Sequence, residues 1–217
     1  KHKADLGIAL DGDGDRLIMV DHKGEIVDGD VLIYIIAQSR LDSGTLKGPV
    51  VGTLMTNLGM EHALQNIGIP LRRAKVGDRY VMEVLKQEGW TIGGESSGHI
   101  ICLDRTTTGD GIVAALQVLY AVHRSGVTLN EIKSGMTKFP QTMVNVRVNG
   151  KIDLDGSEPI QQAINDAENE LGDKGRVLLR ASGTEPLVRV MIEGEDGELV
   201  ARLTNQLASV VEEALSV

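Results

Sequence analysis

Ile8-Ala9-Leu10-Asp11-Gly12-Asp13-Gly14-Asp15-Arg16 is the stretch around which the rest of this chain is organised. An apolar run ends there in aspartates at alternate positions, and carboxylates this close repel one another unless their charge is compensated. Gly12 and Gly14 let the backbone curl so that the three side chains can converge on one point. Hard divalent cations prefer carboxylate oxygens, so we expect Asp11, Asp13 and Asp15 to bind Mg²⁺.

The same stretch allows two other interpretations. The first, a solvated Asp-Gly turn between two strands, remains open from these residues alone. The second, an EF-hand, requires glycine at the sixth loop position and glutamate at the twelfth. Those positions hold Arg16 and His22, which excludes an EF-hand.

Composition indicates a globular protein and excludes several classes of function. Of the 217 residues, 41% are hydrophobic and 24% charged, enough for one large domain or two modest ones. The net charge of −9 and the aromatic fraction of 2% argue against a nucleic-acid partner, which requires a basic face and stacking rings. No apolar run approaches the roughly 20 residues that cross a bilayer, and no signal peptide is recognised, so no membrane partner is expected.

Two features concern the cellular setting and the extent of the chain. The single cysteine, Cys102, excludes an internal disulfide and fits a reducing compartment, so we expect a cytoplasmic protein. The chain opens with Lys1-His2-Lys3, without a methionine and directly before a strand-like run. We therefore expect a fragment of a longer protein.

Up to about residue 139, the pattern alternates between strands and helices. Strands are expected at residues 6–10, 17–20, 25–27, 50–51, 71–76, 90–94 and 100–103. Helices are expected at residues 31–37, 57–67, 78–88 and 110–123, the first with Asp30 as its N-cap. Thr128 and Glu131 predict a capping box for a last short helix. This alternation predicts a mixed, largely parallel α/β sheet.

Pro140 marks a change in pattern. Strands are expected at residues 142–148, 176–180 and 187–192, with helices beginning near Ser157 and covering residues 199–215. The helices carry one apolar face each, so we expect a small, separate α+β domain with its helices on one face of a short sheet.

Three further loops carry chemistry. Lys75-Val76-Gly77-Asp78-Arg79 joins a strand to a helix, and is either an anion site or a plain N-cap by Asp78. Gly93-Gly94-Glu95-Ser96-Ser97-Gly98-His99 offers a carboxylate and hydroxyls that suit sugar hydroxyls, while His99 is either a proton-transfer group or a buried, hydrogen-bonded histidine. Arg180-Ala181-Ser182-Gly183-Thr184-Glu185-Pro186, with Arg189 beyond, suits a phosphate, the alternative being a simple hairpin turn.

Together these loops resemble the metal, sugar and phosphate loops of the α-D-phosphohexomutase superfamily, in the same order. The Ser-Gly-Thr-Glu-Pro form of the last loop, with residues 75–81 and 106–111, is similar to the bacterial phosphoglucosamine mutase family. The resemblance covers essentially the whole chain and implies three parts. Residues 1–28 would be the tail of domain 2 with the metal loop, residues 29–139 the sugar-binding α/β domain 3, and residues 140–217 the phosphate-binding, TBP-like α+β domain 4.

The resemblance also implies an activity and its residues. The whole protein would interconvert glucosamine 6-phosphate and glucosamine 1-phosphate through a bisphosphate and a phosphoserine, supplying cell-wall precursors. The phosphoserine would lie on missing N-terminal domains, so this chain alone would be inactive. The alternatives are a phosphomannomutase or phosphoglucomutase, or a non-catalytic phosphosugar-binding fragment. A homodimer was the one further partner considered.

The implied roles fall into three groups. Mg²⁺ would lie on Asp11, Asp13 and Asp15. Catalytic candidates are Arg16, Asp78, Arg79 and His99. The substrate would be held by Glu95, Ser97, Arg180, Ser182, Gly183, Thr184 and Arg189.

Overall fold

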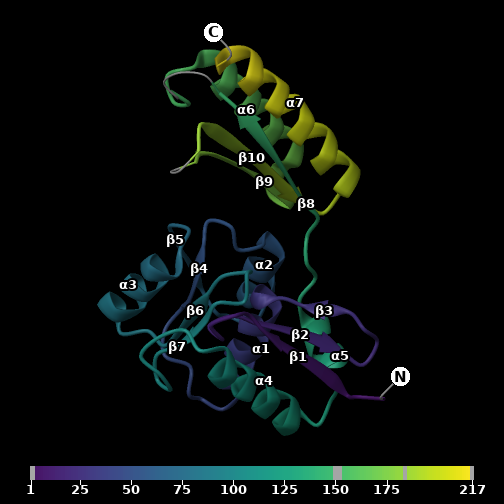
Figure 1. Cartoon of the computed structure of the whole chain (residues 1–217). Helices are drawn as coiled ribbons and strands as arrows, with labels where there is room; N and C mark the ends of the chain where they lie inside the picture. Colours follow the sequence, from purple (N-terminus) through teal and green to yellow (C-terminus); the bar gives the residue numbers. More distant parts are fainter. Residues whose placement is uncertain (1–2, 149–152, 183–184, 216–217) are drawn as a thin grey trace. The chain divides into compact units, whose positions relative to one another are not determined.

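A computed structural model describes residues 3–148, 153–182 and 185–215. The chain divides into two compact units, Lys1–Thr137 and Lys138–Val217 (Figure 1).

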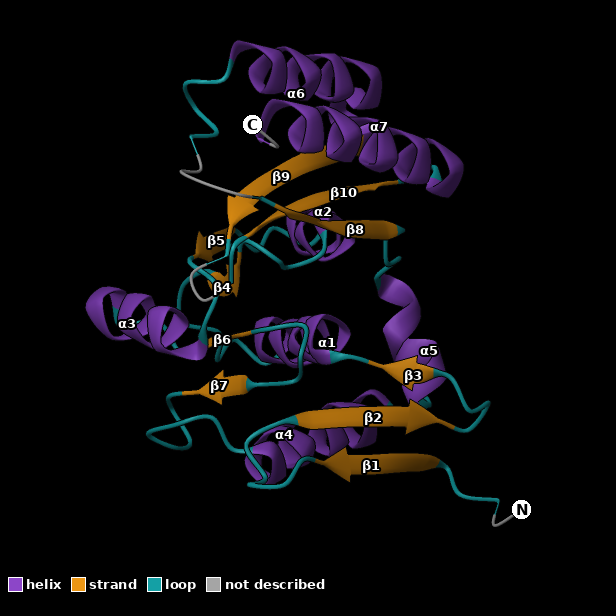
Figure 2. Cartoon of the chain, turned by 45° about the horizontal axis from the view of Figure 1, so that its top comes forward, coloured by secondary structure: helices purple, strands orange, loops and turns teal. Residues whose placement is uncertain are grey.

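The first unit begins with a small antiparallel sheet that presents the aspartate loop. Its order is β1-β2-β3, with β1 at Leu6–Leu10, β2 at Leu17–Asp21 and β3 at Ile26–Val27 (Figure 2). Leu10 pairs with Leu17 across the first hairpin. The aspartates therefore occupy the connection between two paired strands, as the sequence predicts.

The helix that follows, α1 at Gly29–Asp42, begins two residues earlier than expected. Its N-cap is Asp28, whose backbone is extended and whose side chain accepts the N–H of Val31, so the prediction of Asp30 as N-cap is wrong. Asp30 instead lies buried in the first turn, where its Oδ2 accepts the backbone N–H of Asn57 at 2.9 Å. Asp30 therefore fixes the next strand-to-helix connection.

The main sheet of the first unit has the order β5-β4-β6-β7. Its strands are β4 at Val50–Thr53, β5 at Leu71–Ala74, β6 at Ile92–Gly94 and β7 at Ile100–Cys102. Pairings of β4 with β5 and β6 are parallel, and β7 is antiparallel to β6. This confirms the expected mixed, largely parallel sheet.

Helices cover both faces of this sheet because successive strand side chains point to opposite sides. Val51 and Ile101 pack with α3, at Asp78–Glu88, whereas Val50 and Ile100 belong to the core shared with α1. That core also receives α2 at Leu58–Asn66 and α4 at Gly111–Ser125. The short helix α5, Leu129–Ile132, has the predicted capping box between Thr128 and Glu131, and the 3₁₀ turn η1, Lys133–Gly135, follows it.

The second unit is an antiparallel sheet with two helices on one face. The strands are β8 at Gln141–Arg147, β9 at Gly175–Ala181 and β10 at Leu187–Gly194, in the order β8-β10-β9. Helices α6, Glu158–Leu171, and α7, Gly197–Leu215, pack on it, and the 3₁₀ turn η2, Gly172–Lys174, follows α6. Val190 and Ile192 of the central strand meet Ile160 and Leu203 in one core, which confirms the α+β prediction.

No single helix among the described residues is long and apolar enough to cross a membrane; α4 reaches that length only when joined to the segment ending at Gly135, across a bend of 93°.

Candidate functional site

The aspartate loop gathers three carboxylates around one point. One side-chain oxygen from each of Asp11, Asp13 and Asp15 lies within 4.8 Å of the other two. The backbone N–H of Arg16 donates to Asp11 Oδ1 at 3.2 Å, and Arg16 Nε lies 3.7 Å from Asp11 Oδ2. Desolvation acts to raise the pKa of Asp11, but the hydrogen bond from the Arg16 N–H, the interaction with the Asp15 side chain and the Arg16 charge outweigh it and lower that pKa. The loop therefore favours the ionised form of Asp11.

The two glycines of this loop differ in what they contribute. Gly14 has φ of +76°, in the left-handed region where a side chain is strained. Gly12 has no such angle, and a Cβ built on it would meet nothing within 4 Å. The expectation that both glycines permit the curl is therefore right for Gly14 only.

Asp15 supplies the test of whether a cation fits. Its Oδ2 lies 3.1 Å from His99 Nδ1, the distance of a hydrogen bond. Its Oδ1 is buried and has no hydrogen-bond partner among the described residues, and Arg16 Nε is 3.9 Å away. A buried oxygen without a donor is costly, and a hard cation held by three carboxylates would satisfy it. The residues present therefore fit Mg²⁺.

His99 joins the aspartate loop to the beginning of α3. The residue is 7% exposed, and its Nε2 lies 3.9 Å from Asp78 Oδ2. Gly109 lies against the other side of the ring, where a Cβ would be only 2.0 Å from Nε2. The His99 ring is therefore buried with Nδ1 facing Asp15, and both alternatives for its role stay predictions.

The start of α3 lies beside the loop of residues 93–99. The N-cap of α3 is Gly77, with φ of +125° and no side-chain cap, so Asp78 is not the N-cap that one interpretation expected. The N–H of Gly77 donates instead to Glu95 Oε1 at 3.0 Å. Asp78 is the first helical residue, and its side chain is 59% exposed. Lys75 and Arg79 are also exposed, with their cationic groups 5.8 and 5.2 Å from the Tyr80 ring.

Within the loop of residues 93–99, the backbone makes a tight turn. The N–H of Gly98 donates to the carbonyl of Glu95 at 3.0 Å, and the N–H of Glu95 donates to the carbonyl of His99 at 3.1 Å. Glu95 is half-buried and Ser97 is exposed at the tip of the turn. The turn therefore presents a carboxylate and a hydroxyl from a rigid backbone.

Backbone hydrogen bonds bring these loops together at the starts of two helices. The N–H of Gly29, first in α1, donates to Ser96, and that of Gly111, first in α4, donates to Gly14. The first contact requires glycine, since a Cβ on Gly29 would lie 2.1 Å from the Glu95 carbonyl oxygen. These roles of Gly29 and Gly109 are not predictable from the sequence. Nothing in their local pattern marks a close approach by a distant loop.

In the second unit, the strands that flank the loop of residues 182–186 bring two like charges together. Arg180 on β9 pairs directly opposite Arg189 on β10, an arrangement that is unfavourable without an anion. Burial and the Arg189 charge lower the pKa of Arg180, and its buried Nε has no partner among the described residues. Arg189 lies 4.0 Å from Glu185, a weak exposed pair.

The turn between these strands is also described in part. The N–H of Ser182 donates to Leu187, and Ser182 Oγ accepts the N–H of Glu185 at 3.3 Å. Gly183 and Thr184, also expected to hold phosphate, lie outside the described residues. The described part therefore supports an anion site at the two arginines.

Comparison with known proteins places this architecture. A family model described as phosphoglucomutase/phosphomannomutase, alpha/beta/alpha domain III, matches residues 28–139, just over half of the chain. The chain belongs to the phosphoglucomutase/phosphomannomutase family. The model of that family's C-terminal domain matches residues 143–210.

Curated relatives are similar over nearly the whole chain. The phosphoglucosamine mutase of Hahella chejuensis is 61% identical over 209 residues, which are 96% of this chain and 47% of that protein. That of Methylococcus capsulatus is 60% identical over 216 residues, 100% of this chain and 48% of that protein. The chain therefore spans about half the length of the curated relatives that it matches.

Solved structures agree on the fold. The N-acetylphosphoglucosamine mutase of Aspergillus fumigatus matches 98% of this chain and 49% of its own, with a TM-score of 0.81 at 23% identity. The structure of that enzyme with GlcNAc-6P and magnesium gives 0.80 at 22% identity, with the same coverage. At these identities the likeness concerns the fold alone.

Proposed function

We propose that this chain is half of a phosphoglucosamine mutase and that the whole protein interconverts glucosamine 6-phosphate and glucosamine 1-phosphate. Relatives about 60% identical carry that name. The single observation that carries the proposal is the fixed aspartate loop, in which His99 holds one oxygen of Asp15 while the other is buried without a donor. Three converging carboxylates beside a sugar-type loop suit phosphoryl transfer on a sugar.

Asp11, Asp13 and Asp15 would hold Mg²⁺. When bound, this ion supplies positive charge that stabilises the phosphoryl oxygens as negative charge develops during transfer. Arg16 lies within 4 Å of two of these carboxylates and is half-exposed, so its guanidinium can also contact the transferred phosphoryl group. His99 is buried, so we assign it to holding Asp15 in place rather than to proton transfer.

The sugar would be gripped by Glu95 and Ser97. Glu95 is anchored through Oε1 to Gly77, so its second oxygen can accept a hydrogen bond from a sugar hydroxyl. Asp78 and Arg79 begin α3 on the exposed side of the same loop. Asp78 would move a proton at the reacting hydroxyl, and Arg79 would hold phosphate charge.

The phosphate that does not react would be held in the second unit. An anion between Arg180 and Arg189 would remove their mutual repulsion and give the buried Nε of Arg180 a partner. Ser182 adds a hydroxyl, and Gly183 and Thr184 complete the proposed cradle by their place in the sequence. Binding energy from this remote group would position the reacting end of the sugar phosphate.

Four domains are proposed for the whole protein. The second domain would end with residues 1–28 of this chain. The third domain would be residues 29–139, and the fourth would be residues 140–217. The preceding half would carry the phosphoserine, so this chain alone should bind phosphosugar and Mg²⁺ without turnover. We also propose that the whole protein is cytoplasmic and forms a homodimer.

The test is an assay of the whole protein on a panel of hexose phosphates. Glucosamine 6-phosphate should be converted at least tenfold more efficiently than mannose or glucose phosphates. A preference for mannose or glucose phosphates would favour the alternative activities of the same family. No turnover of any of them would overturn the proposed function.

A further inference from the structure

We propose a second anion site in the first unit, for a small phosphate-bearing ligand, at the ends of α1 and α4 remote from the aspartate loop. Three arginines line a pocket of about 230 Å³ there: Arg40 in the last turn of α1, Arg105 after β7 and Arg124 at the end of α4. Gly29 and Gly111, at the opposite ends of these helices, contact the candidate active-site loops. From Gly29 to Arg40, α1 rises roughly 17 Å.

The positive charge in this pocket exceeds what its neighbours neutralise. Asp104 is shared, lying 2.9 Å from Arg40 Nη1 and 3.3 Å from Arg105 Nε. Arg124 forms no ion pair with any described carboxylate, and its Nη1 donates only to the hydroxyl of Tyr120 at 3.4 Å. One carboxylate for three guanidinium groups leaves a net positive pocket that favours an anion.

Arg40 is the buried arginine of this pocket. Its side chain is 7% exposed. It pairs with Asp104, contacts the Cys102 thiol, and makes long hydrogen bonds to Thr91 at 3.4 Å and Gln117 at 3.5 Å. A buried guanidinium with such long contacts can strengthen its bonding when a charged acceptor arrives. Arg105 and Arg124 are exposed and can close over that acceptor from the rim.

The end of α1 would repel an anion if its last carbonyls were bare, because the helix dipole is negative there. They are covered instead. The Ser43 hydroxyl donates to Ser39 and Arg40, and the backbone N–H groups of Thr45 and Leu46 donate to Arg40. The carbonyls of Ser39 and Arg40 at this end of the helix are therefore already hydrogen-bonded.

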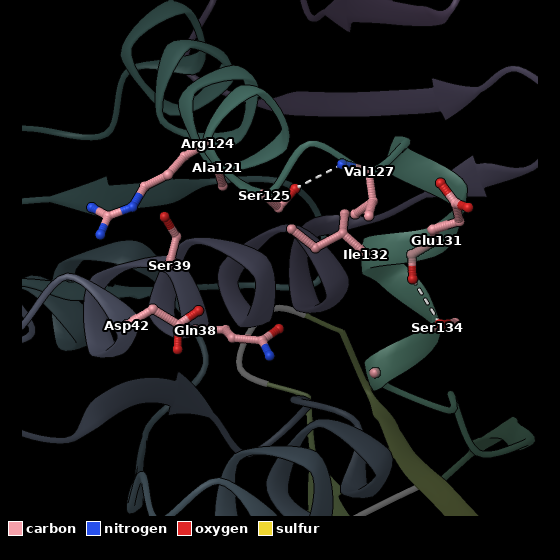
Figure 3. A pocket seen from close by; sticks show the side chains of 11 residues that line it. Gln38, Ser39, Asp42, Ala121, Arg124, Ser125, Val127, Glu131, Ile132 and Ser134 are labelled. Carbon is pink, nitrogen blue, oxygen red and sulfur yellow. Dashed lines mark hydrogen bonds between the residues drawn. The ribbon is translucent and has the colours of Figure 1, made fainter.

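A larger neighbouring cavity, of about 420 Å³, shows where the anion would not bind (Figure 3). It shares Ser39 and Arg124 with the arginine pocket but is also lined by the acids Asp42 and Glu131. In Figure 3, Arg124 extends on the side of Ser39, whereas Glu131 lies across the cavity. The acids of this cavity make it less suited to an anion than the arginine pocket, whose lining contains no carboxylate.

The experiment is an amide-shift NMR titration of the 217-residue chain with inorganic phosphate, with sodium chloride of equal ionic strength as the salt control. Phosphate should shift the amides of Arg40, Thr45 and Arg105 along one saturation curve, and chloride should not. Because signals are assigned to residues, binding at the Arg180 loop is read separately. A parallel titration with glucosamine 6-phosphate distinguishes the source: tighter binding identifies an organic phosphate as occupant, and equal or weaker binding identifies free phosphate.

Two exposed positions provide the variants. Arg105→Gln combined with Arg124→Gln should weaken phosphate binding at these amides at least about tenfold, since each arginine supplies charge-assisted hydrogen bonds. Arg72→Gln, an exposed arginine on β5 outside the pocket, is the matched control and should bind as the unchanged chain does. Absence of saturation, an equal response to chloride, or an equal loss in Arg72→Gln would overturn the proposal.

Discussion

Gly109→Ala should weaken Mg²⁺ binding although Gly109 has no side chain that could coordinate the ion. The new Cβ would lie 2.0 Å from His99 Nε2, about 1.4 Å short of the 3.4 Å at which ordinary contact begins. Since the His99 ring is buried, it has to move by about that amount and would lose its 3.1 Å contact with Asp15. Residues that orient metal ligands typically contribute 10–100-fold to metal affinity, so we expect a loss of roughly that size, about 1.4–2.7 kcal/mol.

The assay is a Mg²⁺ titration of the chain followed through the amide shifts of the aspartate loop. Gly7→Ala, on β1, is the matched control, because its Cβ would meet only Val20 at an ordinary 3.6 Å. In a His99→Ala background the ring is gone, so adding Gly109→Ala should cost nothing more. Affinity within twofold of the unchanged chain for both Gly109→Ala and His99→Ala would refute the role given to His99.

Three further predictions follow from charges elsewhere in the structure. Hydrogen bonds from Lys133 and Asn130 outweigh the effect of burial and hold the pKa of Asp21 far below its usual range. Its contribution to stability is therefore present above about pH 4 and lost as pH falls further. Asp21→Asn should lower the free energy of unfolding by roughly 1.5–3 kcal/mol at pH 7 and by less at pH 3. Urea unfolding followed by Trp90 fluorescence measures both values. An equal loss at the two pH values would contradict this prediction. Burial raises the pKa of Cys102 to about 11, so its thiol should resist a thiol reagent at pH 8 until the unit unfolds, and rapid labelling of the folded chain would be contrary to this account. Arg189→Gln should weaken glucosamine 1-phosphate binding at least about tenfold. It should leave the ligand-free second unit equally stable, or more stable by a few tenths of a kcal/mol, because it removes the repulsion with Arg180. A clear loss of stability in a thermal melt would mean that the arginine is structural.

Elements with a strong local pattern could be predicted from the sequence. The helix α3 has the expected bounds because its apolar side chains repeat at helical spacing and Gly89 ends it in the left-handed conformation. The capping box at Thr128 was likewise readable from a short motif. Asp28 and Asp30 were not separable, because both are aspartates before the same apolar run. The choice depends on Asp30 meeting Asn57 from a different element.

The loops of the candidate site could be found in the sequence, but the contacts between residues of different loops could not. Asp15 and His99 are far apart along the chain, and only the folded first unit brings them to 3.1 Å. The close approaches at Gly29 and Gly109 have no local signal in the sequence, because glycine is required there by contact with the distant backbone of Glu95 and the distant ring of His99. Arg180 and Arg189 were expected to flank one loop. The strand register makes them direct neighbours, and their repulsion is the physical argument for an anion.

The proposed function depends most on the aspartate loop, and Mg²⁺ titration of the chain with Asp13→Asn tests it most directly. Asp13 is exposed and pairs with no described cation, so its substitution removes a ligand without disturbing another contact. Asp5→Asn, an exposed acid outside the loop, is the matched control. We predict saturable binding of one Mg²⁺ per chain, weakened at least about tenfold by Asp13→Asn and unchanged by Asp5→Asn. Absence of saturable binding, or equal affinity in both variants, would contradict the account.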